Sequence, residues 1–504
     1  MSLLSAVAKL VAKWTVKCRK KWENNPVETQ DATLRHLINV GRNTEFGKDH
    51  DFDSIRTYED FKKRVPVKDY EGLRSYVEKI REGKEDVLWK GKPKYFAKTS
   101  GTTSGVKYIP ITKDSIHNHI NSARNALLSY IAETGNAEFL KGKLIFLSGS
   151  PVMSKSKGIF TGRLSGISNH HVPDYLKRSQ LPSYETNCIE DWEQKVDAIV
   201  EETKDADMRL VSGIPPWVQM YFDRLSKAKG NDAKIKDIFP NLSVFVWGGV
   251  NFEPYKAKLF ESIGKNIDSI ELYPASEGFL AYQDTRSEEG LLLLLNEGIF
   301  YEFIPAEEFF DENPTRLSIG QVELGKNYAL VLSSNAGLWG YSIGDTVKFV
   351  SKSPYRVVVS GRIKHFISAF GEHVIGEEVE KAVRHACEIC SEVEITEFTV
   401  APNVTPKEGL PLHEWYFEFE TEPNDIKRFE KLIDDKLRQL NPYYEDLVGG
   451  KILRPLKVMS LKKDAFRSYM KSIGKLGGQN KVPRLSNDRK IADALAESVV
   501  LEKN

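Results

Sequence analysis

Apolar positions recur along this chain with two different periods, and the change of period outlines its elements. Spacings of three and four residues run through residues 27–88, 114–133 and 190–204 and predict amphipathic helices. Short apolar runs between the later helices predict strands, in KLIFLSG, MRLVSG, LSVFVWGG and SIELYPASEG. Helices that alternate with strands are typical of a mixed α/β sheet with helices on both faces.

The chain is too long for one hydrophobic core, because 504 residues predict two or more domains. The pattern changes to strands and turns over residues 290–360, and helices and strands alternate again beyond residue 365. The polar segment SGRIKHF, residues 360–366, is therefore the expected domain boundary.

Composition and charge exclude several functional classes. Lys+Arg at 72 balance Asp+Glu at 71, so the net charge of +1 gives no reason to expect nucleic acid as a partner. No apolar run reaches the ~18 residues that a membrane span needs. Four cysteines and the lack of a secretory leader predict a cytoplasmic protein in a reducing compartment.

The start of the chain departs from this balance. Apolar residues at helical spacing precede a basic cluster: Leu3, Val7, Leu10, Val11 and Trp14, then Lys17, Arg19, Lys20 and Lys21. The pattern predicts a first helix whose apolar stripe packs on the protein body. A basic amphipathic helix in contact with a membrane surface is the alternative interpretation.

Hydroxyl residues and glycines gather in KTSGTTSGVKY, residues 98–108. Such a loop offers backbone freedom, hydroxyl donors and a cation, which together can hold a phosphate. It is not a Walker A loop, because three residues separate Gly101 from Gly105 and a strand-like YIPI follows instead of a helix. We predict the tip of a hairpin, which is either a phosphate site or an ordinary surface turn.

Four further residues combine candidate chemistry with an ordinary structural role. Tyr273 and Glu277, in ELYPASEG, follow a predicted strand, where α/β sheets bind ligands. Considered alone, Tyr273 would be an aromatic residue of the core, and Glu277 would be a carboxylate at a helix N-terminus. Asp345, in GYSIGD, suits hydrogen bonds from a ribose or simply forms a turn. Lys481, in LGGQNKVPR, is a cation in a loop restrained by Pro483 or a solvated residue of a mobile tail.

Taken together and in this order, these motifs resemble those of the adenylate-forming superfamily of acyl-CoA synthetases, peptide-synthetase adenylation domains and luciferases. Within it, the chain looks like a bacterial-type member of the auxin-responsive Gretchen Hagen family of acyl-acid amido synthetases. The resemblance runs from RNTEFGKDHDF to QNKVPR. It implies an α/β fold with a large N-terminal domain of mixed sheets and flanking helices, 1–360, a hinge, 361–364, and a small, mobile α+β C-terminal domain, 365–504.

The resemblance also implies roles for individual residues toward ATP and Mg²⁺. The hydroxyl loop would hold the phosphates through Thr99, Ser100, Gly101, Thr102 and Thr103. The other residues implied in nucleotide binding are Gly248, Gly249, Val250, Tyr273, Ala275, Ser276, Asp345 and Arg362. Glu277 would hold Mg²⁺, and Lys481 would be the catalytic lysine, with Lys475 in IGK as its competitor.

The implied activity is the ATP-dependent conversion of a small carboxylic acid to an acyl-adenylate, followed by transfer to an amine, which we expect to be an amino acid. An acyl-CoA ligase is the first alternative, although Ser104 and Val106 replace the glycine and proline of the wider superfamily's Gly-x-Pro-Lys and disfavour it. A non-catalytic nucleotide or membrane-surface binder is the second. The residues expected to line the acyl pocket are His170, His171 and Trp217.

Overall fold

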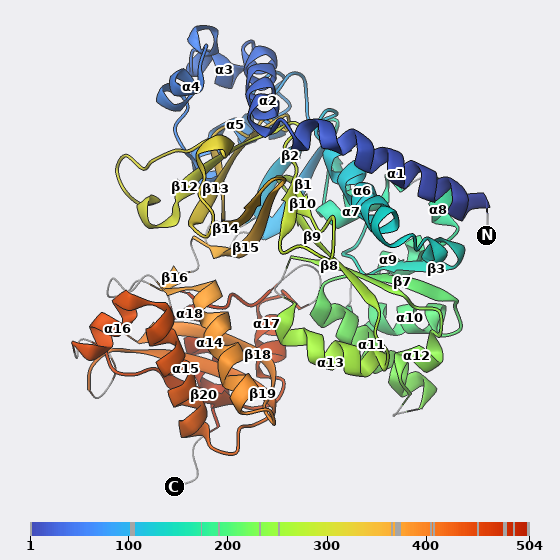
Figure 1. Ribbon diagram of the computed structural model, residues 1–504, viewed down its shortest axis with the longest axis vertical. Helices are drawn as coiled ribbons and strands as arrows, with labels where there is room; N and C mark the ends of the chain where they lie inside the picture. Colours follow the sequence, from blue (N-terminus) through green and yellow to red (C-terminus); the bar gives the residue numbers. More distant parts are fainter. Residues whose placement is uncertain are drawn as a thin grey trace. The chain divides into compact units, whose positions relative to one another are not determined.

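The chain folds into two compact units, shown in a computed structural model (Figure 1). The first unit comprises Met1–Ile343 and Val347–Val358, and the second comprises Gly344–Thr346 and Val359–Asn504. The structure describes residues 3–100, 106–172, 174–189, 192–230, 233–249, 252–363, 366–367, 374–403, 406, 409–450, 453–476, 481–486 and 489–500.

Helices form the start of the first unit: α1 (Leu3–Glu23), α2 (Pro26–Gly41), α3 (Glu45–Asp49), α4 (Tyr58–Arg64) and α5 (Tyr70–Arg81). Side-chain caps set where two of them begin. Thr57 and Asp60 form a capping box at α4, and Asp69 accepts hydrogen bonds from the backbone N–H groups of Glu71 and Gly72 at α5. These helices confirm the helical prediction for this stretch of the chain.

A small sheet of the first unit carries the hydroxyl loop. Its strand order is β2-β1-β5-β4, with β1 (Tyr95–Ser100), β2 (Val106–Ile111), β4 (Ser154–Ser156) and β5 (Ile159–Gly162). β1 and β2 are antiparallel, and Thr99 pairs with Lys107 next to the loop. The predicted hairpin is therefore confirmed.

The described residues also form an eleven-stranded sheet, in the order β12-β13-β14-β15-β11-β10-β9-β8-β7-β3-β6. Its strands are β3 (Lys143–Phe146), β6 (Gln180–Leu181), β7 (Met208–Ser212), β8 (Val244–Gly248), β9 (Asp268–Ala275), β10 (Gly278–Tyr282), β11 (Leu291–Leu293), β12 (Ile299–Pro305), β13 (Asn327–Ser334), β14 (Tyr341–Lys352) and β15 (Tyr355–Arg362). The run from β6 to β9 is parallel, whereas β9, β10, β11 and β15 pair in antiparallel fashion.

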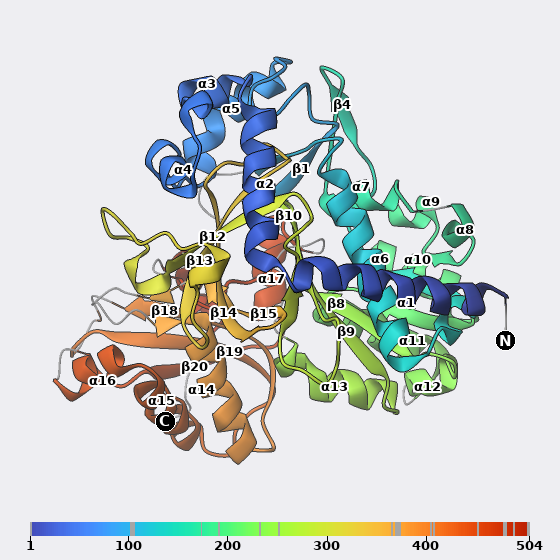
Figure 2. The same cartoon turned by 45° about the horizontal axis from the view of Figure 1, so that its top comes forward.

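Helices cover both faces of the parallel part of this sheet. α6 (Ile116–Thr134) packs on one face and α1 lies along α6, as Figures 1 and 2 both show. The opposite face is covered by α10 (Trp192–Thr203), α11 (Pro215–Lys229), α12 (Ile235–Ile238) and α13 (Glu253–Ile263). Short helices connect these layers: α7 (Leu164–Asn169), α8 (Asp174–Lys177) and α9 (Tyr184–Asn187). The mixed α/β prediction is confirmed, because the predicted helices and strands alternate as expected.

The second unit is a small sheet between two layers of helices. Its strands β18 (Glu394–Asn403), β19 (Leu412–Thr421) and β20 (Lys457–Leu461) pair in that order, and β16 (Phe366–Ile367) pairs with β17 (Val374–Ile375). Alternate side chains of β19 point to opposite faces of the sheet. On one face, Trp415 and Phe417 pack with α14 (Gly376–Ile389), α15 (Ile426–Leu440) and α16 (Pro442–Gly449). Tyr416 packs with α17 (Ala465–Ser472) and α18 (Lys490–Leu495). The prediction of a small α+β C-terminal part is confirmed.

The expectation that the apolar stripe of α1 packs on the protein body is wrong. Val7, Leu10, Val11 and Trp14 are exposed, whereas the small residue Ala12 faces α6 and is fully buried. A small side chain lets the two helices approach closely, so the larger apolar residues point outward. Within the described residues, no helix has the length and apolar character needed to cross a bilayer.

Candidate active site

Two of the candidate motifs meet at the carboxyl ends of neighbouring parallel strands. β8 and β9 pair with Gly248 opposite Leu272, so the glycine pair Gly248 and Gly249 lies beside Tyr273. A Cβ atom on Gly248 would lie 2.4 Å from the carbonyl oxygen of Leu272, and Gly249 has a φ of 78°, so both positions require glycine. Strand ends of this kind are where α/β sheets bind ligands. Val250, the next candidate, lies outside the described residues.

Glu277 lies in the turn between β9 and β10. The two strands form an antiparallel hairpin in which Ala275 pairs with Gly278, so Ser276 and Glu277 make the turn. The Tyr341 hydroxyl donates a hydrogen bond to Glu277 Oε1 at 3.4 Å. The interpretation of Glu277 as a carboxylate at a helix N-terminus is therefore wrong, because a strand follows it.

Two buried residues support this turn, and sequence analysis did not single them out. The Asn118 side chain on α6 accepts a hydrogen bond from the Phe279 N–H at 2.6 Å and donates one to the Phe279 carbonyl at 2.9 Å. Burial, reinforced by Glu277, raises the pKa of Tyr341 well above its usual value, so its hydroxyl stays a donor. Asn118 lies 161 residues from Phe279 in the sequence, and Tyr341 lies 64 residues from Glu277, so no local sequence pattern could predict these contacts.

The hydroxyl hairpin is described up to the edge of its loop. Thr99 is half-buried at the end of β1, and Ser100 pairs with Val106 across the hairpin. The Lys107 ammonium lies 6.0 Å from the centroid of the Tyr70 ring. The remaining loop candidates lie outside the described residues: Gly101, Thr102 and Thr103. The phosphate role of this loop stays a prediction.

In the second unit, Asp345 and Arg362 form an ion pair, with 2.8 Å between Arg362 Nε and Asp345 Oδ1. The Ile363 N–H donates a hydrogen bond to the Gly344 carbonyl at 2.6 Å and ties the end of β15 to β14. The Asp345 side chain is 17% exposed and that of Arg362 is 50% exposed. The carboxylate is therefore the enclosed partner, and the guanidinium is the solvent-facing one.

Lys481 lies within electrostatic range of this ion pair. Burial lowers the pKa of Lys481 to about 8, Asp345 opposes the lowering, and Arg362 and Arg484 add to it. The residue as a whole still keeps exposed surface. Lys475 follows α17 in the same unit, and the choice between the two lysines stays a prediction.

The segment that carries Lys481 is fixed along β18. Thr399 Oγ1 donates a hydrogen bond to the Pro483 carbonyl at 2.6 Å, and the Val400 N–H donates one to the Arg484 carbonyl at 2.9 Å. The alternative of a mobile tail is therefore wrong for this described segment. Arg484, the last residue of QNKVPR, adds a second cation near Lys481 that sequence analysis did not consider separately.

The three residues expected to line the acyl pocket have different surroundings. His171 Nε2 lies 2.9 Å from the Tyr95 hydroxyl on β1, and burial lowers the pKa of His171, so the neutral ring can accept this hydrogen bond. His170 is exposed, with Nε2 2.9 Å from a backbone carbonyl oxygen. Trp217 is buried between α10 and α11. Only His171 of the three is thus tied to the strand that leads into the hydroxyl loop.

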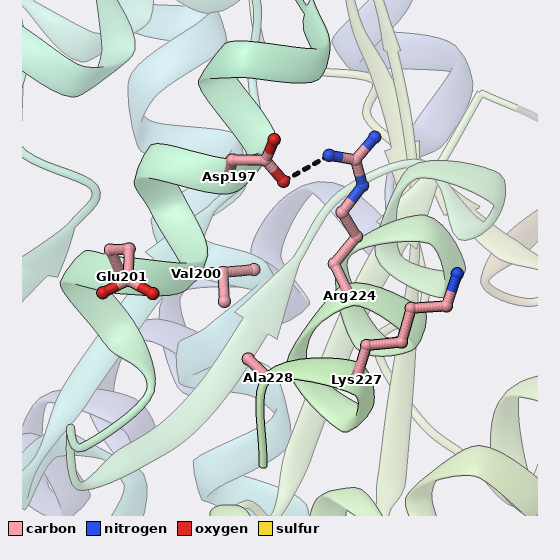
Figure 3. A pocket seen from close by; sticks show the side chains of 6 residues that line it. All are labelled: Asp197, Val200, Glu201, Arg224, Lys227 and Ala228. Atoms are coloured by element: carbon pink, nitrogen blue, oxygen red, sulfur yellow. Dashed lines mark hydrogen bonds and ion pairs between the residues drawn. The ribbon is translucent and has the colours of Figure 1, made fainter. Parts of the chain in front are cut away.

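A surface hollow of about 450 Å³ lies between α10 and α11 (Figure 3). Charges of both signs line it, and Asp197 forms an ion pair with Arg224 there. Its lining residues are Asp197, Val200, Glu201, Arg224, Lys227 and Ala228. None of these belongs to a candidate motif, so we assign the hollow no ligand.

Solved structures share the fold of this chain. The acyl acid amido synthetase GH3.15 matches with a TM-score of 0.78 at 17% identity, and the match covers 96% of each chain. 2-Hydroxyisobutyryl-CoA ligase in the postadenylation state, in complex with 2-HIB-AMP, matches with a TM-score of 0.60 at 13% identity, over 93% of this chain and 91% of that one. The chain therefore has the fold of adenylate-forming enzymes, a large α/β unit with a smaller C-terminal unit.

Models of one family match three successive parts of the chain. The GH3 family N-terminal domain matches residues 17–198, the central domain matches 292–362, and the C-terminal domain matches 377–490. The chain belongs to the GH3 family, which confirms the resemblance drawn from its motifs. Jasmonoyl--L-amino acid synthetase JAR4 of Nicotiana attenuata is 21% identical, over 80% of this chain and 81% of that protein. The bacterial-type assignment stays a prediction.

Proposed function

We propose that the protein uses ATP to convert a carboxylic acid to an acyl-adenylate and then transfers the acyl group to an amino acid. The succession of GH3 N-terminal, central and C-terminal domains along one chain carries this proposal. The names of similar proteins support it: JAR4 is a jasmonoyl--L-amino acid synthetase, and GH3.15 is an acyl acid amido synthetase.

The strand ends of the first unit suit an adenine nucleotide. The largely buried Tyr273 lies at this edge beside the strand end at Gly248 and Gly249, and its ring can stack on a planar base. Ala275 and Ser276 continue the same edge into the turn. In the second unit, the enclosed Asp345 carboxylate offers acceptors for ribose hydroxyls, and the solvent-facing Arg362 can turn toward phosphate.

Glu277 suits a magnesium ion that accompanies ATP. Mg²⁺ prefers oxygen ligands and is often held by one or two carboxylates together with substrate phosphates. Glu277 is a half-buried carboxylate whose turn is held by Tyr341 and Asn118. When bound there, Mg²⁺ would neutralise negative charge on the phosphates.

The chain's residues serve the first step by position and charge. A carboxylate oxygen of the acid attacks the α-phosphorus of ATP, a new oxygen–phosphorus bond forms, and the bond to pyrophosphate breaks. Lys481 and the hydroxyl loop would oppose the charge that develops on the departing pyrophosphate. In the second step the amine nitrogen attacks the acyl carbon, AMP departs, and the nitrogen loses a proton.

We further propose that Lys481 acts only in the first step. The part of the chain after the hinge, residues 365–504, would bring Lys481 to the nucleotide for adenylation and then rotate about the hinge to make room for the amine. A cation aimed at the departing pyrophosphate helps only the step in which that charge develops, which supports a role confined to adenylation. The last residue of the predicted hinge, 361–364, lies outside the described residues.

The acid itself would lie near the hydroxyl hairpin, where His171 contacts Tyr95. The surroundings of His170 and Trp217 suit structural roles, because one contacts a backbone carbonyl and the other is buried between helices.

The four cysteines form no disulfide, which supports a reducing compartment such as the cytoplasm.

The experiment that tests the function is ATP–pyrophosphate exchange with a panel of carboxylic acids, followed by addition of an acyl acceptor. Exchange that depends on an acid, with amide formed from an amino acid, is the expected result. Thioester formed from coenzyme A instead would make the protein an acyl-CoA ligase. ATP binding without exchange for any acid in a broad panel would make it a non-catalytic nucleotide binder.

A further inference from the structure

The outer face of α1 is unusually apolar for a solvent-facing helix. Leu10 is 70% exposed and Trp14 is 67% exposed, and Val7 and Val11 lie beside them at three- and four-residue spacing. These four side chains therefore form one stripe along the helix. We call this stripe with its flanking lysines the α1 outer face.

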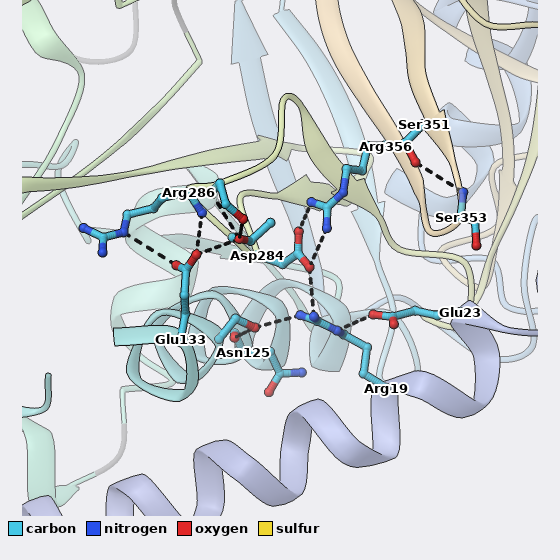
Figure 4. A network of polar contacts seen from close by, with 12 residues as sticks. Arg19, Glu23, Asn125, Glu133, Asp284, Arg286, Ser351, Ser353 and Arg356 are labelled. Carbon is cyan, nitrogen blue, oxygen red and sulfur yellow. Dashed lines mark hydrogen bonds and ion pairs between the residues drawn. The ribbon is translucent and has the colours of Figure 1, made fainter. Parts of the chain in front are cut away.

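Polar contacts on the inner side of α1 fix which face points outward. Arg19 donates hydrogen bonds to Ser129 Oγ at 2.9 Å and to Asp284 Oδ2 at 2.8 Å, and it also pairs with Glu23 (Figure 4). Asp284 is bound in turn by Arg356, whose Nη2 lies 3.2 Å from Asp284 Oδ2. Turning the apolar stripe inward would break this buried network and leave its charges unpaired. The outer face is therefore built into the folded unit.

The charges exposed on α1 have one sign. Lys13, Lys17, Lys20 and Lys21 are exposed, whereas the helix's acidic residue, Glu23, is buried and paired with Arg19. The whole chain has a net charge of only +1, so this excess of lysines is local. A partner that covers the outer face must therefore accept apolar side chains and carry negative charge.

We propose that the α1 outer face docks on the surface of a membrane that contains anionic lipids. Val7, Leu10, Val11 and Trp14 would enter the boundary between headgroups and acyl chains, and the lysines would contact lipid phosphates and carboxylates. The helix would lie in the plane of the membrane, since no described helix can cross a bilayer. A second copy of the chain fits less well, because two copies of one basic face would repel each other.

The test measures sedimentation of the full chain with vesicles of phosphatidylcholine alone and with about three-tenths phosphatidylserine. Wild-type protein should sediment with the anionic vesicles and not with the neutral ones. Trp14→Glu should weaken this binding at least about tenfold, because it removes an inserted ring and adds a repelled charge. Phe310→Glu is the matched control, since Phe310 is 61% exposed outside α1, and it should leave binding unchanged.

A second pair of variants tests the charges. Lys13→Gln combined with Lys17→Gln should weaken binding about 25-fold, at about fivefold for each lysine near an anionic surface. Lys227→Gln combined with Lys236→Gln, which neutralises exposed lysines on α11 and α12, should have no effect. ATP–pyrophosphate exchange in solution should be the same in all these variants, so failure of membrane binding stays distinct from failure of the enzyme.

Lipid contact can also be read at Trp14 itself. Brominated acyl chains should quench part of the fluorescence of the eight tryptophans, and Trp14→Phe should abolish that quenching while the protein still binds. Equal binding to both kinds of vesicle, or equal loss in Trp14→Glu and Phe310→Glu, would overturn the proposal. Dissociation of a dimer by Trp14→Glu, with no vesicle binding by the wild type, would instead make the face a contact between copies.

Discussion

Glu277→Gln removes a negative charge from the turn between β9 and β10 and keeps the size of the side chain. The Tyr341 hydroxyl donates to Glu277 Oε1, and the amide oxygen of glutamine can accept the same hydrogen bond. Asn118 would still hold Phe279. This variant therefore tests the charge with the turn preserved, whereas Tyr341→Phe removes the support and keeps the charge.

The two variants should differ strongly in activity. A group that stabilises developing charge in a transition state contributes ~2.7–4 kcal/mol, which corresponds to ~100-fold to 1000-fold in rate. The Tyr341 hydrogen bond is long, at 3.4 Å, so its loss should cost no more than ~1 kcal/mol. We expect Glu277→Gln to slow acid-dependent exchange at least ~100-fold and Tyr341→Phe to slow it less than ~10-fold.

The assay is exchange of labelled pyrophosphate into ATP, with a magnesium titration for each variant and urea unfolding as the control for folding. Glu277→Gln should also need more Mg²⁺ for half-maximal exchange, and Tyr341→Phe should not. If folded Glu277→Gln keeps more than ~10% of the wild-type rate, less than ~1.4 kcal/mol of transition-state stabilisation is lost. Glu277 would then be a turn residue without a metal.

Four other outcomes follow from the site and the network around α1. Asp345→Ala should weaken AMP binding at least ~10-fold, because hydrogen bonds to a charged group contribute ~1.5–3 kcal/mol each; unchanged affinity by calorimetry would contradict the ribose assignment. Lys481→Ala should suppress adenylate formation but still convert synthetic acyl-adenylate and amine to amide. Lys475→Ala should change neither half-reaction. Equal losses in the two half-reactions of Lys481→Ala would exclude a role confined to the first step. Because burial lowers the pKa of Lys481 to about 8, its charged fraction falls as pH rises through that value, and adenylation kcat/KM should fall with it; a flat profile would count against the lysine. Asp284→Asn should lower the free energy of unfolding by ~3 kcal/mol, since two buried arginines lose their carboxylate, and a urea midpoint like that of the wild type would refute this.

The parallel strands and the hydroxyl hairpin could be predicted because their signals are local. A strand buried on both faces is apolar at successive positions, as in the first part of β8 and at Leu210 and Val211 of β7. The hairpin places a polar, glycine-rich stretch between two apolar strands, and Thr99 pairs with Lys107 accordingly. These features need no knowledge of distant parts of the chain.

The surroundings of Glu277 could not be predicted, because they depend on distant residues. A carboxylate just before an apolar run can start a helix or close a hairpin, and GFLAY has no period that separates the two. In the structure, Ala275 pairs with Gly278, so the segment closes a hairpin and does not start a helix. Asn118 and Tyr341 reach the turn from other elements, so their roles appear only in three dimensions.

The orientation of α1 was misjudged for a different reason. An apolar stripe is usually the buried face of a helix. Here the inner side is formed by Ser5, Ala12 and Arg19, because small side chains allow close packing on α6 and the arginine meets a buried carboxylate. That carboxylate, Asp284, lies 265 residues further along the chain, so its presence under the helix leaves no local trace in the sequence.

β14 connects two of the candidate groups by a short piece of chain. Tyr341, which supports Glu277, and Asp345 are four residues apart on this strand but belong to different units. Gly344 between them has a φ of 82°, and a Cβ atom there would meet only Arg362 Nη2 at 3.8 Å, so glycine is required by the backbone and not by lack of space. Four residues span at most ~14 Å, so any rearrangement of the two units would leave Asp345 within that distance of Tyr341. Lys481 belongs to the same compact unit as Asp345 but has no such short tether to Tyr341, so a rotation of that unit can displace the lysine much further than it displaces Asp345.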